Sequence, residues 1–183
     1  GGAFGQQLDL QGCRRLLDVG GGVGSYTLAL LARYPELQAT ILELPAVVPW
    51  TREFVAEAGV PERVSVEPLD FLSDPLPRGH DVVLLSNILH DQPPAVNQGL
   101  LTRAYQALET GGRVVVYEFL LDDGRVTPPT SALFAVMMLV ENQGGNVYTA
   151  QDILGWLAAA GFDGLAVQRL PEPSPMAVIS GTR

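Results

Sequence analysis

The chain has 183 residues, of which 47% are hydrophobic and 17% are charged, as expected for one globular domain with a substantial core. Its formal net charge of −9, with no cluster of basic residues, argues against a nucleic-acid partner and against an anionic membrane surface. The single cysteine, Cys13, excludes an internal disulfide. Because neither an export leader nor an apolar run of about 18 residues is visible, we expect a cytoplasmic protein.

Segments typical of strands and helices alternate through the first two thirds of the chain. The apolar runs predict strands at 14–19, 39–44, 63–66, 81–85 and 113–117, and helical spacing predicts helices at 25–34, 47–58 and 94–108. The run DVVLL at 81–85 is continuous enough to be buried on both faces of a sheet. This order is typical of a mainly parallel α/β sheet.

The last third of the chain follows a different pattern. Helices are expected at 130–140 and 150–160, followed by two strands at 166–170 and 176–180. Three prolines between those strands indicate a short rigid loop, which suits an antiparallel hairpin. We therefore predict one α/β domain over residues 1–183, with a seven-stranded, mostly parallel sheet that ends in an antiparallel hairpin.

A glycine-rich turn, DVGGGVG at 18–24, joins the first expected strand to the first expected helix. Glycines let the backbone turn tightly and approach a ligand closely. In an open parallel sheet, ligands bind beyond the carboxyl ends of the strands. We therefore expect a nucleotide-type cofactor at this turn rather than an empty loop. No Gly-Lys-Ser/Thr follows, which excludes a phosphate-binding P-loop.

Side chains after other strands narrow the choice of cofactor. Glu43, at the end of the second strand, suits the ribose of either NAD or S-adenosylmethionine. Asp18 would place a carboxylate near the ammonium group of S-adenosylmethionine, and Asp70-Phe71 offers an acid and a ring to an adenine. The antiparallel hairpin also favours S-adenosylmethionine, because sheets that bind NAD normally continue in parallel. An NAD-dependent oxidoreductase stays open as the weaker alternative.

Two further polar groups follow neighbouring strands. His90-Asp91 comes after the fourth strand and Glu118 ends the fifth, so these side chains are expected at the same edge as the glycine turn. Histidine, with an ordinary pKa of about 6.5, can accept a proton near neutral pH, and a carboxylate such as Glu118 can hold its ring in the useful tautomer. As an alternative, Asp91 caps the following helix. The other histidine, His80, lies in a polar turn and is expected to be solvated and idle.

Several stretches in this order resemble the small-molecule O-methyltransferases typified by plant caffeic acid and bacterial polyketide or phenazine methyltransferases. They read LLDVGGGVGSYTLALLARYPELQATILELPAVV, LDFLSDPLPRGHDVVLLSNILHD and GGRVVVYEFLLDD, and the similarity continues through NQGG and AAAGF. The resemblance implies a class I methyltransferase fold of Rossmann-like type and S-adenosylmethionine as cofactor. It also implies transfer of a methyl group to a hydroxyl of a small aromatic or polyketide-like acceptor, leaving S-adenosylhomocysteine.

The same resemblance implies roles for particular residues. His90 would be the general base, with Glu118 and Asp91 beside it. The cofactor would be bound by Asp18, Gly20, Gly22, Glu43, Leu44, Asp70, Phe71 and Ser86. The acceptor would contact Phe134, Met138 and Asn142, whereas Met137 is expected to pack in the core. Since no cluster of metal-binding side chains is evident, the chemistry is expected to be metal-independent.

The sequence departs from the family pattern in three ways. Val147 stands where a second acid often brackets the histidine, and Gln92 replaces the tryptophan that usually follows the His-Asp pair. The family's N-terminal dimerisation domain, which closes part of the pocket and forms a homodimer, is absent from these residues. A cofactor-binding or regulatory domain without efficient catalysis is therefore the main alternative to an active enzyme.

Overall fold

The computed structural model describes residues 8–171 and 173–183, and the strands in this part of the chain form one sheet. They are β1 (Arg15–Val19), β2 (Gln38–Glu43), β3 (Val64–Pro68), β4 (His80–Ser86), β5 (Leu108–Phe119), β6 (Asp163–Arg169) and β7 (Met176–Thr182). The seven strands lie in the order β3-β2-β1-β4-β5-β7-β6. Pairing is parallel from β3 to β5, while β7 is antiparallel to both β5 and β6. The predicted parallel sheet with an antiparallel C-terminal hairpin is confirmed.

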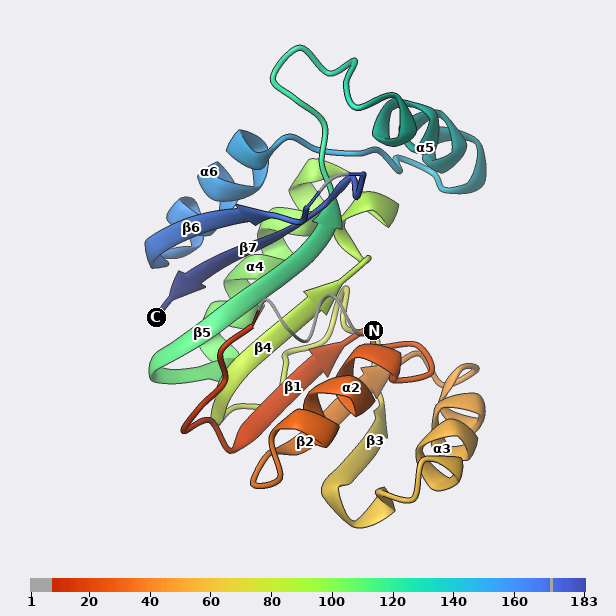
Figure 1. The fold of residues 1–183 in the computed structure, drawn as a ribbon, viewed down its shortest axis with the longest axis vertical. Coiled ribbons are helices and arrows are strands. Elements are labelled where there is room, and N and C mark those ends of the chain that lie inside the picture. The colour runs from red at the N-terminus through yellow and green to blue at the C-terminus, as the bar shows by residue number, and fades with distance from the viewer. Residues whose placement is uncertain (1–7, 172) are drawn as a thin grey trace.

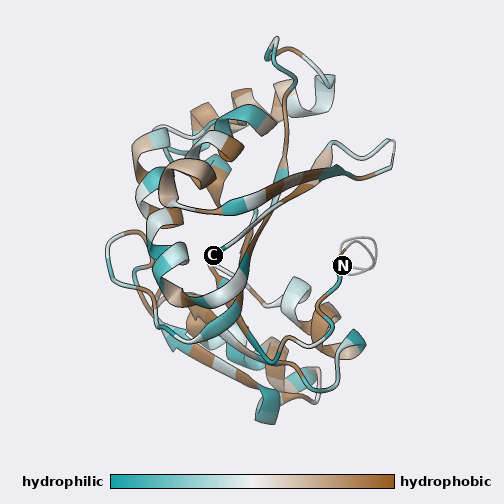
Figure 2. Ribbon diagram, turned by 90° about the vertical axis from the view of Figure 1, so that its left-hand side faces the viewer, coloured by the Kyte–Doolittle hydropathy of each residue, from teal (hydrophilic) through white to brown (hydrophobic). Residues whose placement is uncertain are grey.

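Helices cover both faces of this sheet. They are α2 (Ser25–Arg33), α3 (Val48–Glu57), α4 (Pro94–Ala107), α5 (Pro129–Glu141) and α6 (Ala150–Ala160), with single 3-10 turns η1 (Pro61–Arg63) and η2 (Leu89–Asp91). Figure 1 shows α2 in front of the strands and α4 and α6 behind them. In the edge-on view of Figure 2, α4 and α6 are stacked along one side of the sheet.

The two faces of β4 explain how the core is divided. Val83 and Leu85 pack in the cluster that includes the apolar side chains of α4 and α6. Val82 and Leu84 point the other way, into the cluster formed with α2 and α3. Because both faces are buried, the run at 82–85 has no polar residue. The carboxyl end of this rigid strand leads directly into η2.

Two differences from the expected elements appear at the amino end of β4. Strand β5 begins at Leu108, before Gly111, and its register with β4 shifts between His80 and Val82. Gly111 has φ +81°, so this glycine bends the strand instead of only ending a helix. The expectation that His80 is solvated is wrong: it is buried as the first residue of β4, with Nδ1 3.2 Å from the carbonyl oxygen of Pro77.

Helix α5 lies beyond the carboxyl end of β5, next to η2 (Figure 1). Only Ser131 and Met138 of this helix are buried, although it is strongly apolar. Its exposed apolar side chains are Leu133, Val136, Met137, Leu139 and Val140. The expected core position of Met137 is therefore wrong, since it is 46% exposed. No helix in the described part of the chain is long and apolar enough to cross a membrane.

Candidate active site

The glycine turn has a backbone conformation that requires glycine at several positions. Gly20, Gly22 and Gly24 have φ of +65°, +58° and +80°, in the left-handed region that other residues rarely enter. A Cβ atom on Gly20 would lie only 2.3 Å from Cδ1 of Ile88, whereas one on Gly22 would meet no atom within 4 Å. The backbone at Gly22 therefore faces open space, which a ligand could fill.

Glu43 joins this turn to the end of β2. Its Oε1 accepts a hydrogen bond of 2.7 Å from the backbone N–H of Gly22, and its Oε2 accepts one of 2.8 Å from that of Leu44. A carboxylate has about four acceptor positions, so two stay available for the hydroxyl groups of a ribose. The side chain is buried, and its orientation is fixed before any ligand binds. Glu43 thus fits the cofactor role expected of it.

Asp18 lies beneath the turn and is fully buried. Its Oδ2 accepts a 2.6 Å hydrogen bond from the hydroxyl of Thr27 on α2, and its Oδ1 has no donor among the described residues. Burial, with the charge of Glu43, outweighs the hydrogen bond from Thr27 and raises the pKa of Asp18 to about 7. Direct contact with a cofactor stays a prediction for Asp18, because in this structure its carboxylate is turned toward α2.

The turn after β3 brings Phe71 against the glycines. A Cβ atom on Gly20 would lie 3.1 Å from Cζ of Phe71, so the ring borders the turn. Asp70 is exposed and accepts hydrogen bonds from the backbone N–H of Leu72 (3.1 Å) and the hydroxyl of Ser73 (2.8 Å). Ser86 is buried at the end of β4. Phe71 thus borders the glycine turn, as expected of an adenine contact.

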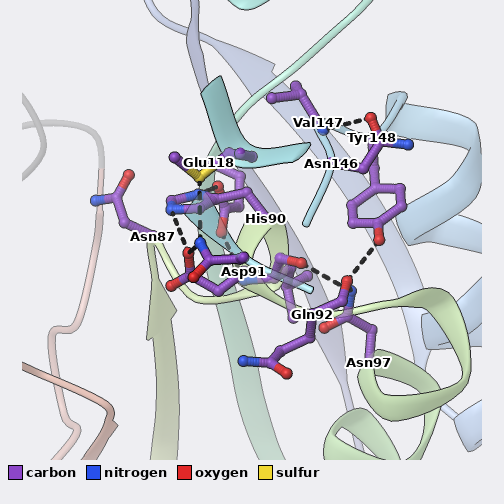
Figure 3. Close-up of polar contacts among 12 residues, drawn as sticks. Asn87, His90, Asp91, Gln92, Asn97, Glu118, Asn146, Val147 and Tyr148 are labelled. Atoms are coloured by element: carbon purple, nitrogen blue, oxygen red, sulfur yellow. Dashed lines mark hydrogen bonds and ion pairs between the residues drawn. The ribbon is translucent and has the colours of Figure 1, made fainter. Parts of the chain in front are cut away.

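The His90 ring is held by Glu118, as Figure 3 shows. Nδ1 of His90 lies 2.8 Å from Oε2 of Glu118, and both side chains are buried. The other oxygen of Glu118 accepts a 2.8 Å hydrogen bond from the backbone N–H of Leu89. With Glu118 ionised, Nδ1 carries the hydrogen and the lone pair of Nε2 is left for an incoming proton.

A second carboxylate lies on the Nε2 side of the ring. Oδ1 of Asp91 is 3.6 Å from Nε2 of His90, and the amide of Asn142 donates a 2.6 Å hydrogen bond to the same oxygen. Asp91 does not cap α4, whose N-cap residue is Pro93 without a side-chain bond, so that alternative is wrong. Val147 is a buried apolar side chain, and Asp91 supplies the second acid beside the histidine.

These charges act on both titratable groups. Burial lowers the pKa of His90, but the hydrogen bond and charge of Glu118, with the charge of Asp91, outweigh it, so the net pKa is raised above its ordinary value. Burial raises the pKa of Asp91. The positive form of His90 lowers it by more than the charge of Glu118 raises it, but burial prevails and the net pKa is above its ordinary value. The pair thus retains a proton more readily than either isolated group.

Aromatic rings surround the open side of His90. Phe134 on α5 meets the His90 ring edge to face, with centroids 4.9 Å apart, and lies 4.4 Å from the ring of Phe119. Met138 is buried on the same helix, with its Sδ 3.7 Å from the amide nitrogen of Asn142. Sequence reasoning missed Phe119, although its place directly after Glu118 on β5 is a usable signal. The structure brings the expected base and the expected acceptor residues of α5 together.

Sequence reasoning also missed Asn87, which has φ +56°. A side chain other than glycine in this conformation is uncommon, and such residues cluster at functional sites. Its amide donates a 3.2 Å hydrogen bond to the hydroxyl of Tyr26 on α2, and Figure 3 shows Asn87 on the far side of the His90–Glu118 pair from Tyr148. Asn87 thus links the loop that carries His90 to the helix that follows the glycine turn.

A glycine turn after β1, an acid at the end of β2 and an antiparallel β7 between β5 and β6 together define the class I methyltransferase fold. Within that class, the chain belongs to the O-methyltransferase domain family, which matches residues 3–163. The shared stretch includes the glycine turn, the His90–Glu118 pair and α5.

The chain is also similar to curated methyltransferases and to a solved structure with bound SAH. The chain is 39% identical over 176 residues to 3-hydroxy-5-methyl-1-naphthoate 3-O-methyltransferase of Streptomyces sahachiroi, covering 96% of this chain and 51% of that protein. It is 36% identical over 179 residues to L-tyrosine C(3)-methyltransferase of Streptomyces lavendulae, with 96% and 49% covered. The structure of PigF with SAH superposes with a TM-score of 0.91 at 31% identity, covering 98% of this chain and 53% of that one. The chain spans about half the length of the relatives that it matches.

Proposed function

We propose that this domain transfers a methyl group from S-adenosylmethionine to a hydroxyl group of a small aromatic or polyketide-like acceptor, with His90 as general base. The observation that carries the proposal is the 2.8 Å contact between Nδ1 of His90 and Glu118. It leaves Nε2 as the proton acceptor beside the aromatic side chains of α5 and β5. Family membership and similarity to a naphthoate O-methyltransferase support the same reaction.

The open space at Gly22 and the free acceptor positions of Glu43 fit a nucleoside cofactor, with Phe71 beside the turn for its adenine. When bound, the cofactor supplies an electrophilic methyl group, which leaves sulfur with the carbon–sulfur electron pair staying on sulfur as an oxygen–carbon bond forms. The carboxylate of Glu43 favours a cationic ligand here, and so does the ionised form of Asp18, whose pKa is about 7. The set of cofactor residues stays a prediction.

Removal of the acceptor's proton is the task of His90. A phenol has a pKa of about 10, above the pKa of a histidine even when Glu118 raises it. Proton transfer from the hydroxyl to Nε2 is therefore concerted with formation of the oxygen–carbon bond, and Glu118 and Asp91 stabilise the imidazolium ion that results. His90 and Glu118 are both buried, which limits the access of water to this step.

The acceptor's shape is indicated by the rings of Phe119 and Phe134. Their 4.4 Å contact, inclined at 35°, and the edge-to-face contact of Phe134 with His90 form an apolar wall beside the base. A planar aromatic ring can stack against such a wall while its hydroxyl group points to Nε2. This arrangement supports an aromatic acceptor rather than a sugar or an aliphatic alcohol.

Replacement of His90 tests the proposal. We expect His90→Ala to lose turnover of phenolic acceptors by about 100-fold or more, while calorimetry shows unchanged affinity for S-adenosylhomocysteine. His80→Gln is the matched control, because His80 lies at the opposite end of β4, and it should retain turnover. Unchanged turnover in the His90 variant would refute its role as the base.

Methylation at carbon is a second candidate function, favoured by the similarity to L-tyrosine C(3)-methyltransferase. Removal of a phenol proton by the same base also activates the ring carbon next to the hydroxyl group. Mass spectrometry and NMR of the methylated product distinguish the two outcomes, since only the O-methyl product has lost the phenolic hydroxyl.

The remaining alternatives are separated by binding and turnover. Calorimetry with S-adenosylhomocysteine and with NAD tests the oxidoreductase alternative, for which NAD alone would bind. A regulatory domain would bind S-adenosylhomocysteine but give no turnover with any phenol, either alone or with an upstream domain. Metal independence and a homodimer formed through the family's N-terminal domain stay predictions, checked by turnover in a chelator and by light scattering.

A further inference from the structure

The loop that carries His90 is held by hydrogen bonds to two other parts of the chain, the segment 146–148 and strand β5. The backbone N–H of Asn146 donates a 2.8 Å bond to the carbonyl oxygen of His90. The hydroxyl of Tyr148 donates a 2.5 Å bond to the carbonyl oxygen of Gln92 (Figure 3). From the opposite side, Glu118 accepts the N–H of Leu89. Both backbone carbonyl oxygens and a backbone N–H group of the loop are therefore held by hydrogen bonds.

Asn97, on the first turns of α4, connects the two ends of this loop. Its Nδ2 donates to the carbonyl oxygen of Leu89 at 2.9 Å and to that of Gln92 at 3.1 Å. These carbonyls lie on either side of His90 and Asp91. One amide group thus determines how far apart the first and last residues of the loop stand, and with them the position of the imidazole.

The burial of Asn97 calls for a specific explanation. The side chain is fully buried, and its Oδ1 has no hydrogen-bond donor in the described part of the chain. A buried acceptor without a donor destabilises the folded state, and asparagine is a weaker helix former than leucine. A leucine would pack here without that penalty. The two hydrogen bonds that Asn97 donates therefore explain why an asparagine occupies this position.

We propose that Asn97 is a positioning residue for the general base, acting with Tyr148 through the carbonyls of the His90 loop. The inference rests on the proposed function of His90. Glu118 connects the loop backbone to the His90 ring, because one of its oxygens binds the backbone N–H of Leu89 and the other binds Nδ1 of the ring. A loop that moves away from α4 must lengthen one of these two bonds.

The acidity of the ring reports on this geometry. The charged groups that face His90 are Glu118 from β5 and Asp91 from η2 itself, with Glu141 at the end of α5 acting on Asp91. Since the bond to Glu118 raises the pKa of His90 and burial opposes it, loosening that bond lowers the pKa toward or below about 6.5. A change that only destabilises the fold would leave this pKa unchanged in the folded fraction.

NMR titration of the two histidine rings tests the proposal in the chain saturated with S-adenosylhomocysteine. With only His80 and His90 present, a His80→Gln variant assigns the signals. We expect Asn97→Leu to lower the pKa of His90 by about half a unit or more and to leave that of His80 unchanged. Gln98→Leu, the adjacent exposed amide on α4, is the matched control and should move neither pKa. A folded Asn97→Leu protein with an unchanged His90 pKa would overturn the inference.

Tyr148→Phe keeps the test decisive if Asn97→Leu does not fold. It removes a single hydroxyl, and we expect a smaller downward shift of the same pKa; an unshifted His90 pKa would overturn the inference here too. Turnover gives an independent check, because Asn97→Leu should reduce kcat about 10-fold or more yet have no further effect in a His90→Ala background. Equal effects in both backgrounds would show a structural role. Failure of His90→Ala to reduce turnover would refute the base itself, whatever the NMR titration shows.

Discussion

Glu118 performs two tasks with its two carboxylate oxygens. Oε2 orients the His90 ring, and Oε1 accepts the backbone N–H of Leu89. Charge-assisted hydrogen bonds of this kind are about twice as strong as neutral ones. A single buried side chain thus determines the tautomer of His90, its proton affinity and the start of its loop.

Glu118→Gln separates charge from shape at this position. In the proposed mechanism the neutral ring of His90 is the active form, so activity is expected to be lost as the pH falls through its raised pKa. Removing the carboxylate charge lowers that pKa, so we expect the acidic limb of the kcat/KM profile to move to lower pH. The maximal rate should fall about 10-fold or more, because the imidazolium ion loses its stabilising partner. A limb that stays in place in this variant would contradict the pairing.

At the scale of elements, cofactor contact at the glycine turn can be tested by substitution, with a glycine elsewhere in the chain as the control. Gly22 and Gly59 have φ of +58° and +70°, and a Cβ atom on either would meet no atom within 4 Å. Alanine at each position should therefore cost a similar backbone strain of about 1–2 kcal/mol. We expect only Gly22→Ala to weaken S-adenosylhomocysteine binding, by about 10-fold or more in calorimetry. Equal affinities for the two variants would place the ligand away from Gly22.

The order of the elements, and the strand ends that carry Glu43, His90 and Glu118, could be predicted from the sequence. These predictions succeeded because the spacing of apolar residues identifies the helices and strands. A parallel sheet then places the carboxyl ends of neighbouring strands at one edge. Partnerships between distant side chains could not be predicted in this way. The bond between Asn142 and Asp91 joins residues 51 positions apart and depends on how α5 lies over η2, which no local pattern encodes.

The same limit explains the errors at His80 and Met137. Polar neighbours predicted a solvated turn for His80, but a shift in strand register draws it into β4. An apolar helix predicted burial for Met137, but only one side of α5 meets the rest of the described chain. In both cases the tertiary arrangement outweighed the local composition.

For the whole molecule, the buried carboxyl of Asp18 links stability to pH. Its pKa is raised to about 7 from an ordinary 3.8. An acid with a raised pKa in the folded state contributes stability below its unfolded pKa and loses that contribution as the pH rises through the folded pKa. Between about pH 4 and 7, the folded chain therefore becomes less stable as the pH rises, because Asp18 is ionised in the unfolded chain but still protonated in the folded one.

Asp18→Asn removes this dependence while an amide oxygen still accepts the Thr27 hydroxyl. We expect the melting temperature of the variant, relative to that of the unsubstituted chain, to rise from pH 5 to about pH 7 and then to level off. Differential scanning calorimetry without ligand measures the difference directly, and the other titrating groups cancel in the comparison. A constant difference across this range would show that Asp18 is not the linked group.

Helix α5 and the His90 loop differ in how tightly the fold constrains them, and this difference bears on how new acceptors could evolve. The loop's residues are joined through Glu118 and Asn97, so a substitution there disturbs several bonds at once. Most side chains of α5 instead have open space on their outer side. If α5 contacts the acceptor as proposed, substitutions that change acceptor choice can therefore accumulate along it one at a time, while the proposed chemistry of proton removal is inherited unchanged.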